Sequence, residues 1–416
     1  MRRGTALLFL AALRAVAADL SPETLLLAKA RARMSTNLSR LPDYTCVQTI
    51  ERFGRDSSKG RPHLVDVVRL EVALVGGNEL FSWPGSGKFL DTEISKLVVG
   101  GAIGNGNFAL HAKSVFQSSS PRFTYVGEQV YKTRKVLRWD YVVAQNQSGY
   151  RIRVNTREAI VGYHGSILVD SESLDLVRLE VHADDIPPRL ELLSSRDAVE
   201  YARVPIGTET FLLPSLSELE MVALRGSMNH NRTRFSKCRQ YTGESTLIFD
   251  EPEPSATAAE APVREVEAPP GVRFEAALAA TVVFTNAAVG DPVTAVLVSP
   301  LKIPGGITVP KGSLVHGRIL SLRTSYVGRQ AGRAVGLTFT HAVAADTSVK
   351  FQATLEEIRT AMPGIKTRSS FSGALARPEN ESLIGSVFFV QQQVLRLPQG
   401  LRMTWRTVAP SPEDNQ

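Results

Sequence analysis

The segment from Tyr163 to Pro187 alternates between apolar and polar residues on both sides of a polar turn. Ile167 and Val169 alternate with Ser166, Leu168 and Asp170, and residues 170–173 supply the turn. The alternation resumes after the turn at Val177, Leu179 and Val181. A period of two is the repeat of an extended strand, whose successive side chains point to opposite faces. This stretch therefore predicts an antiparallel hairpin with one buried face and one face in water.

Similar short apolar runs follow one another along most of the chain, and the connections between them are short. Short connections favour antiparallel neighbours, because parallel strands need long crossovers. One helix is predicted from 21 to 41, where a Ser-Pro-Glu start offers a cap, a first-turn proline and a favourable charge. Further helices are predicted at 91–99 and 108–116, inserted after the early strands. The expected fold class is mainly β: an open antiparallel half-barrel with a helical insertion, then a small β-barrel.

The length of 416 residues exceeds what one core usually holds, so two domains are expected. Residues 250–270 are rich in Pro, Ala and Glu and poor in large apolar side chains, which is typical of a linker. The expected organisation is a signal peptide at 1–18, a half-barrel domain at 19–249, the linker at 250–270, a barrel domain at 271–408 with a mobile loop at 361–380, and a disordered tail at 409–416.

The first residues have the pattern of a secretory signal peptide. A basic start at 1–3 precedes an apolar run at 6–13, and small residues near Ala17 and Ala18 suit a cleavage site. No later stretch has the 18 or more apolar residues that a transmembrane helix needs. The sequence therefore predicts an exported protein of the periplasm or cell envelope, without a transmembrane helix in the mature chain.

The chain contains two cysteines, Cys46 and Cys238. In an oxidising compartment such a pair is expected to form a disulfide bond. The bond would join the first predicted strand of the first domain to its last. Loop-closure entropy sets an upper limit of roughly 5 kcal/mol on its contribution to stability.

Motifs of catalysis, metal binding and nucleic-acid binding are not found in the sequence. The glycines near Lys88 lack the residues of a phosphate-binding loop, and no nucleophile elbow or zinc-ligand spacing occurs. The basic residues do not cluster with aromatic residues as in a nucleic-acid site. The sequence therefore predicts no cofactor, no metal, no nucleic acid and no enzyme activity, and a hydrolase with an unrecognised site is the weakest alternative.

Five aromatic residues lie in or beside the predicted helical insertion. Two interpretations are open: ordinary packing of helices on a sheet, or the lining of an apolar cavity. The candidate ligand-binding residues are Phe81, Trp83, Phe89, Phe108 and Phe116.

The first domain resembles the periplasmic lipoprotein carriers and the related sensor domains of envelope-stress signalling. The resemblance lies in the helix before the first strand, the inserted helices, and the hairpin formed by Gly165–Asp170 and Leu174–Glu180. It implies an unclosed barrel whose helical lid covers a cavity for acyl chains. The chain also resembles uncharacterised secreted proteins of soil bacteria around Cys46 and Cys238.

The second domain is similar to the barrel domain of type IV secretion and conjugation channel proteins. The matching segments are Val289–Asp291, Pro310–Ser313 and Gly317–Ile319.

Two functional hypotheses follow. In the first, the half-barrel binds a lipid, an acyl chain or a hydrophobic peptide, and the second barrel docks to an envelope protein complex. In the alternative, the chain is a structural component of an envelope or secretion complex, and its own aromatic side chains fill the half-barrel.

Overall fold

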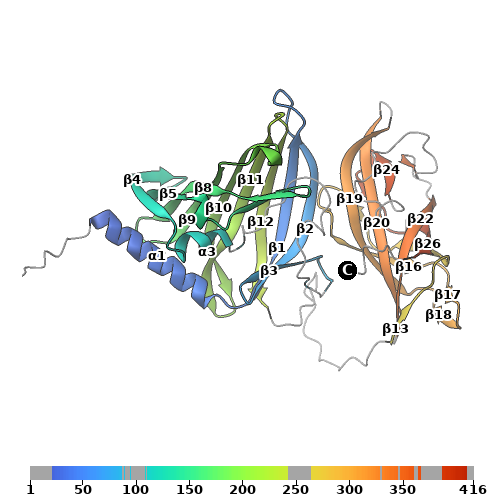
Figure 1. The fold of residues 1–416 in the computed structure, drawn as a ribbon. Coiled ribbons are helices and arrows are strands. Elements are labelled where there is room, and N and C mark those ends of the chain that lie inside the picture. Colours follow the sequence, from blue (N-terminus) through green and yellow to red (C-terminus); the bar gives the residue numbers. More distant parts are fainter. Residues whose placement is uncertain are drawn as a thin grey trace, which may run out of the picture.

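The fold was analysed in a computed structural model, which describes residues 21–86, 89, 94, 108, 110–241, 264–327, 330–344, 347–359, 364–366 and 387–409. The predicted signal peptide, most of the predicted helix at 91–99 and nearly all of the predicted tail lie outside these residues. The described residues form two large sheets, so the protein is mainly β as expected (Figure 1).

The first sheet has ten strands. They are β1 (Tyr44–Arg55), β2 (His63–Val75), β3 (Asn78–Ser82), β4 (Arg122–Tyr131), β5 (Arg134–Val143), β8 (Gly162–Asp170), β9 (Leu176–Asp184), β10 (Leu192–Ile206), β11 (Glu209–Ala223) and β12 (Met228–Gln240). Their order is β3-β2-β1-β12-β11-β10-β9-β8-β5-β4, and every pair is antiparallel. A small separate hairpin pairs β6 (Arg151–Val154) with β7 (Arg157–Ile160). The sheet is curled and open, because its end strands β3 and β4 do not pair with each other.

One long-range pairing organises this sheet. β1 pairs with β12, about 190 residues later, as well as with its neighbour β2. The predicted disulfide bond between Cys46 and Cys238 is present and joins these two strands beside a β-bulge. The bond therefore links the strands that come first and last in the chain order of this sheet, as the sequence predicts.

The predicted hairpin around residue 170 is present as β8 and β9. The expectation of one wet face is wrong in part, because Ser166 and Leu168 on the other face are also buried. A register shift between Leu168 and Val169 leaves Val177 as an extra residue of β9. Such a bulge moves the following side chain to the opposite face, and Val177 packs with Leu168 and Val136 there.

Two helices lie together on one side of the first sheet, which we call the inner face (Figure 1). They are α1 (Pro22–Arg40), at the predicted place, and α3 (Leu110–Phe116). Ala30, Met34 and Leu38 of α1 are buried at a spacing of four residues, which places them on one stripe of the helix. Two short 3₁₀ turns, η1 (Gln145–Gln147) and η2 (Pro188–Leu190), connect strands at the rim.

The second sheet forms the predicted small barrel. Its strands are β13 (Arg264–Glu267), β14 (Arg273–Leu278), β16 (Pro292–Leu297), β19 (Leu314–Val327), β20 (Gln330–Ala344), β21 (Thr347–Lys350), β22 (Gln352–Arg359), β23 (Ile365–Lys366), β24 (Val387–Gln391) and β26 (Arg402–Val408). Small pairs are formed by β15 (Val282–Val283) with β25 (Arg396–Leu397), and by β17 (Leu301–Ile303) with β18 (Ile307–Val309). Because only Phe351 separates β21 from β22, they act as one bent strand that pairs with β20 through β21 and with β26 through β22. This bent strand closes the ring that runs through β20, β19, β16, β14 and β26.

The last part of the predicted linker at 250–270 belongs to the second sheet. Residues 264–267 form β13, which pairs in parallel with β21, and Ala268 is buried in the second core. Lys350 of β21 pairs with Glu265 at 2.6 Å, a contact that the local composition does not reveal. Residues 242–263, and most of the predicted loop at 361–380, lie outside the described residues.

The two sheets meet along β2 and β19, which lie side by side (Figure 1). β3 covers the edge of β2 only from Glu71 onward. Val289 pairs with the preceding part of this edge through two backbone hydrogen bonds of 2.8 Å. Its carbonyl accepts from the amide of Arg69, and its amide donates to the carbonyl of Val67. Val289 is also buried in the core of the first sheet. Val289 therefore joins both the backbone hydrogen bonding and the buried core of the first sheet at this junction.

Candidate functional site

The inner face of the first sheet is apolar and rich in aromatic side chains. Beneath α1 and α3 it forms one buried cluster, whose largest sheet residues are Trp139, Tyr141, Tyr163, Ile167, Leu179 and Tyr201. These residues follow the period-two pattern of β5, β8, β9 and β10, which directs them to the same side. A helix over such a face keeps a large apolar surface out of water.

Polar contacts of Asn37, Arg31 and Arg33, which we call the rim contacts, hold α1 in place. The Asn37 side chain donates to the carbonyl of Leu212 at 3.0 Å and accepts from its amide at 2.9 Å. Arg31 donates to the carbonyl of Ser118, just after α3, at 2.7 Å. Arg33 pairs with Asp175 at 2.8 Å, half-exposed on the arginine side. These contacts bind the helix by its edges rather than through its buried stripe.

Asp175 is the most strongly held of these anchors. Burial would raise the pKa of its carboxyl, but hydrogen bonds from Arg203 and Arg33 outweigh burial, and the pKa lies below its usual value. Arg203 contributes two contacts of 2.7 Å from the neighbouring β10. The carboxylate therefore ties the helix to both β9 and β10 while it is ionised.

A small hollow lies beneath α1. It is lined by Met34, Leu176, Leu212 and their neighbours and has a volume of about 20 Å³, which is room for about one water molecule and far below the roughly 300 Å³ of the smallest usual ligand pockets. A ligand on this face would therefore have to displace α1 or rearrange the side chains below it.

The five predicted aromatic residues do not gather around one hollow. Phe81 and Phe108 are buried, with Trp83 packed beside them, in a cluster between β1, β2 and β12. Phe116 belongs to the cluster under α1, and the ring of Phe89 lies edge-on to Tyr241, with centroids 5.7 Å apart.

Trp83 has a second environment that the sequence does not indicate. The guanidinium of Arg318, from the second barrel, lies 5.4 Å from the centre of its ring. Gly290 lies so close that a Cβ there would be 2.6 Å from the ring. Trp83 is therefore part of the junction between the two sheets.

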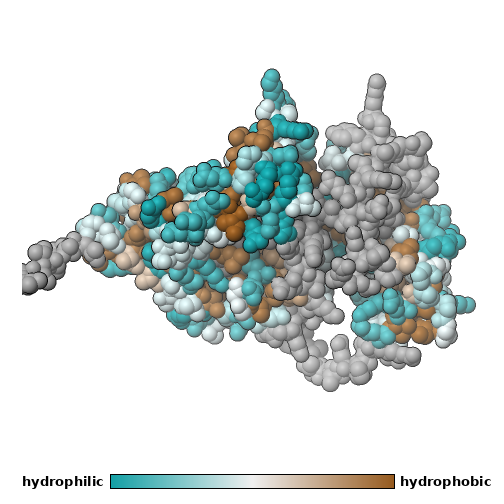
Figure 2. Space-filling view, in the orientation of Figure 1, coloured by the Kyte–Doolittle hydropathy of each residue, from teal (hydrophilic) through white to brown (hydrophobic). Residues whose placement is uncertain are grey.

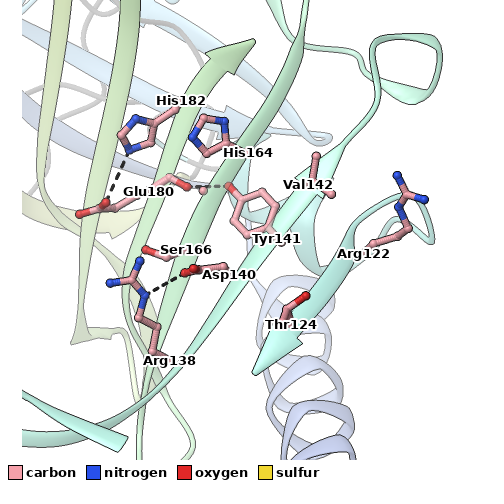
Figure 3. A pocket seen from close by; sticks show the side chains of 11 residues that line it. Arg122, Thr124, Arg138, Asp140, Tyr141, Val142, His164, Ser166, Glu180 and His182 are labelled. Atoms are coloured by element: carbon pink, nitrogen blue, oxygen red, sulfur yellow. Dashed lines mark hydrogen bonds and ion pairs between the residues drawn. The ribbon is translucent and has the colours of Figure 1, made fainter. Parts of the chain in front are cut away.

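The opposite face of the first sheet, which we call the outer face, carries an open hollow of about 430 Å³ (Figure 3). Its polar lining comes from four adjacent strands, β4, β5, β8 and β9, and includes Arg122, Arg138, Asp140, His164, Ser166, Glu180 and His182. All of these except Ser166 are ionisable groups, and a polar surface of this kind has little affinity for an apolar ligand.

Most ionisable groups of this hollow are already paired. Arg138 contacts Asp140 at 2.8 Å, and His164 contacts Asp184 at 2.7 Å (Figure 3 shows the first pair). Glu180 lies near His182, Arg178 and Arg196, and these hydrogen bonds and charges lower the pKa of its carboxyl to about 2 despite partial burial. Within the described residues, no group of three His, Cys, Asp or Glu side chains could hold a metal ion.

The described part of the face shown in Figure 2 has no single broad apolar patch. On the face shown in Figure 2, hydrophobic residues are interspersed with hydrophilic ones over the described strands. Among the described helices, none is both long and apolar enough to cross a membrane.

Comparison with known proteins gave limited matches. No protein-family profile matches the chain, and no curated protein does. Among solved structures, a LolA superfamily protein from Nitrosomonas europaea is 11% identical, with a TM-score of 0.28, over 52% of this chain and 93% of that one. A putative outer membrane lipoprotein-sorting protein domain from Vibrio parahaemolyticus is also 11% identical, with a TM-score of 0.30, over 52% of this chain and 93% of that one.

Proposed function

We propose that the protein is an exported, non-enzymatic binding protein of the cell envelope, in which the inner face of the first sheet holds an apolar ligand such as an acyl chain. Helix α1 is the lid of this site. The observation that carries the proposal is that a helix of 19 residues covers an aromatic sheet face with only three buried residues and is anchored by polar contacts at the rim.

This arrangement makes α1 replaceable. If α1 lifts, the apolar face below becomes exposed, so the open form is rare in water. An apolar ligand that covers the same face removes that cost and shifts the equilibrium toward the open form. The rim contacts are part-buried hydrogen bonds and one ion pair that is half-exposed on the arginine side; each contributes about 1 kcal/mol, which a ligand that covers the apolar face can offset.

The disulfide bond and the basic-apolar N-terminal region support export, because disulfide bonds persist in oxidising compartments. The division into half-barrel, linker and second barrel, and a role of the second barrel in an envelope assembly, are parts of the same proposal.

A second candidate function is that of a scaffold without a ligand. It is favoured by the small volume, about 20 Å³, of the hollow beneath α1, which leaves little room for a ligand while α1 is in place. The two candidates differ in whether α1 can be displaced.

The test is titration with a fluorescent fatty-acid analogue, comparing the wild type with Asn37→Ala. The substitution removes two hydrogen bonds to Leu212, each contributing about 1 kcal/mol. Because apparent affinity depends on the population of the open form, binding should tighten by up to about thirtyfold. Ser39→Ala is the control, since the Ser39 hydroxyl donates only to Thr36 of the same helix, and its affinity should match the wild type.

Native mass spectrometry of the protein purified from its own compartment supplies the second readout. Co-purified lipid supports the binding proposal. An unliganded mass together with no binding of the probe by the wild type or Asn37→Ala would favour the scaffold.

A further inference from the structure

A buried polar cluster interrupts the apolar inner face of the first sheet. His111 of α3 faces Asp197 of β10, with Nε2 and Oδ2 separated by 3.6 Å. The hydroxyl of Tyr150 donates to Oδ2 of Asp197 at 3.3 Å and lies 3.4 Å from the hydroxyl of Ser195. We call these four residues the inner polar cluster.

Two atoms of this cluster have no hydrogen-bond partner within the described residues. They are Oδ1 of Asp197 and Nε2 of His111, on side chains that are only 4% and 10% exposed. A buried polar atom without a partner is costly, and it calls for an explanation. The contacts that do exist are also longer than ordinary hydrogen bonds, so the cluster is loosely connected.

The cluster lies where a ligand under the lid could reach it. Asp197 and Ser195 belong to the sheet, whereas His111 belongs to α3. The segment just after α3 is tied to α1 through Arg31 and the carbonyl of Ser118. Movement of α1 would therefore loosen α3 and separate His111 from Asp197.

The chemistry of the cluster selects the group that would satisfy it. An ionised carboxylate only accepts hydrogen bonds, whereas an imidazole nitrogen donates or accepts according to its tautomer. A hydroxyl can donate to Oδ1 of Asp197 and accept from Nε2 of His111 at the same time. An ether oxygen or a hydrocarbon cannot donate to the carboxylate.

We propose that the inner polar cluster binds the hydroxyl head of the apolar ligand, with Asp197 and His111 as its two partners. The ligand class is then a long-chain molecule that ends in a hydroxyl group. This inference rests on the proposed function, because it assigns the polar end of the ligand held beneath α1.

The test compares two probes with the same chain, 1-dodecanol and dodecyl methyl ether, in displacement of the fluorescent fatty-acid analogue. Hydrogen bonds to charged groups are stronger than neutral ones, so the wild type should bind the alcohol about tenfold more tightly than the ether. This ratio should fall below about threefold in Asp197→Asn, because a neutral amide oxygen accepts the hydroxyl proton more weakly than the carboxylate does. His111→Phe should weaken both probes by a similar factor and keep the ratio, because an ether oxygen accepts from Nε2 as a hydroxyl oxygen does. Asp140→Asn, a carboxylate of the outer face, should keep the wild-type ratio.

The ratio separates a binding role from a structural one, because a structural change weakens both probes equally. Equal affinities for the two probes in the wild type would overturn the inference and leave the apolar site intact. A full tenfold ratio in folded Asp197→Asn would also overturn it. Failure of both probes and of the fluorescent analogue to bind would instead refute the proposed function itself.

Discussion

At the scale of single residues, the junction between the two sheets depends on a buried ion pair. Arg52 and Asp66 lie opposite each other on β1 and β2 and make two hydrogen bonds of 2.6 Å. Their side chains are only 4% and 1% exposed. Arg323, which lies 257 residues beyond Asp66, adds a contact of 3.2 Å from the second barrel. Arg and Asp are almost never fully buried unless they are paired, and this ion pair accounts for their burial here.

The first prediction concerns Asp66→Ala. It leaves the buried charge of Arg52 without the carboxylate, and breaking a buried pair in this way costs about 3–5 kcal/mol. The free energy of unfolding from urea titration should fall by that amount. Asp140→Ala breaks the exposed pair with Arg138 and should cost less than about 1 kcal/mol. A similar loss in both variants would show that the burial of Asp66 has no energetic consequence.

At the scale of elements, the sequence pattern identified most strands and the helix predicted at 21–41, because strand parity and a first-turn proline are local properties. The predicted cap was wrong, since the Ser21 side chain contacts the Thr24 hydroxyl and makes no capping hydrogen bond. It did not identify the bulge that turns Val177 outward, since the pairing partner lies on another strand. Cross-strand pairs are a related case. β19 and β20 place His316 opposite His341, with ring centres 4.8 Å apart.

The second prediction is a pH dependence from this histidine pair. Burial lowers the pKa of both imidazoles, and that of His341 is lowered further by the charges of His316, Lys350 and Arg318. The unfolded chain therefore binds more protons in mild acid, and stability falls as pH falls. The contribution of the pair is complete above the ordinary histidine pKa of about 6.5 and is lost below it.

Thermal unfolding between pH 7.5 and 5.5 tests this prediction. The midpoint should decrease more steeply for the wild type than for the double variant His316→Gln/His341→Gln. Carboxylates with lowered pKa values, such as Glu180, lose their contribution only below their unfolded value of about 4.3, so they do not affect this range. Parallel pH curves for the two proteins would contradict the prediction.

At the scale of the whole molecule, the two sheets are joined by close backbone contact. Gly290 has a φ of +98°, and a Cβ at this position would lie 2.3 Å from the carbonyl oxygen of Arg69 and 2.6 Å from the ring of Trp83. Arg69 also pairs with Asp291 through two contacts, one of 2.6 Å. The arrangement requires a residue without a side chain at position 290.

The third prediction is that Gly290→Ala weakens the junction. A left-handed backbone costs an alanine about 1 kcal/mol, and the overlap with Arg69 and Trp83 adds about 1–3 kcal/mol. Gly312→Ala is the matched control, because its φ is +89° and its Cβ would meet open space. Limited proteolysis should release the two halves from Gly290→Ala sooner than from Gly312→Ala. Equal rates would mean that close packing at Gly290 does not hold the sheets together.

The candidate site shows the same division between local and distant information. The sequence indicated an aromatic group near the helical insertion, but it could not show that Trp83 contacts Arg318 of the second barrel. It gave no signal for the inner polar cluster, because His111, Tyr150 and Asp197 are far apart in the chain and follow no spaced motif.

By itself, the sequence determined the mainly β class, the helix at Pro22–Arg40 and the pairing of the two cysteines, since these depend on side-chain alternation, a first-turn proline and composition. Only the tertiary structure decided that residues 264–267 join the second sheet, that the bend at Phe351 closes the barrel, and that Val289 completes the edge of β2. The reason is physical: each of these features depends on contacts between segments far apart in the chain, and local patterns do not specify which distant partner will occupy an open edge.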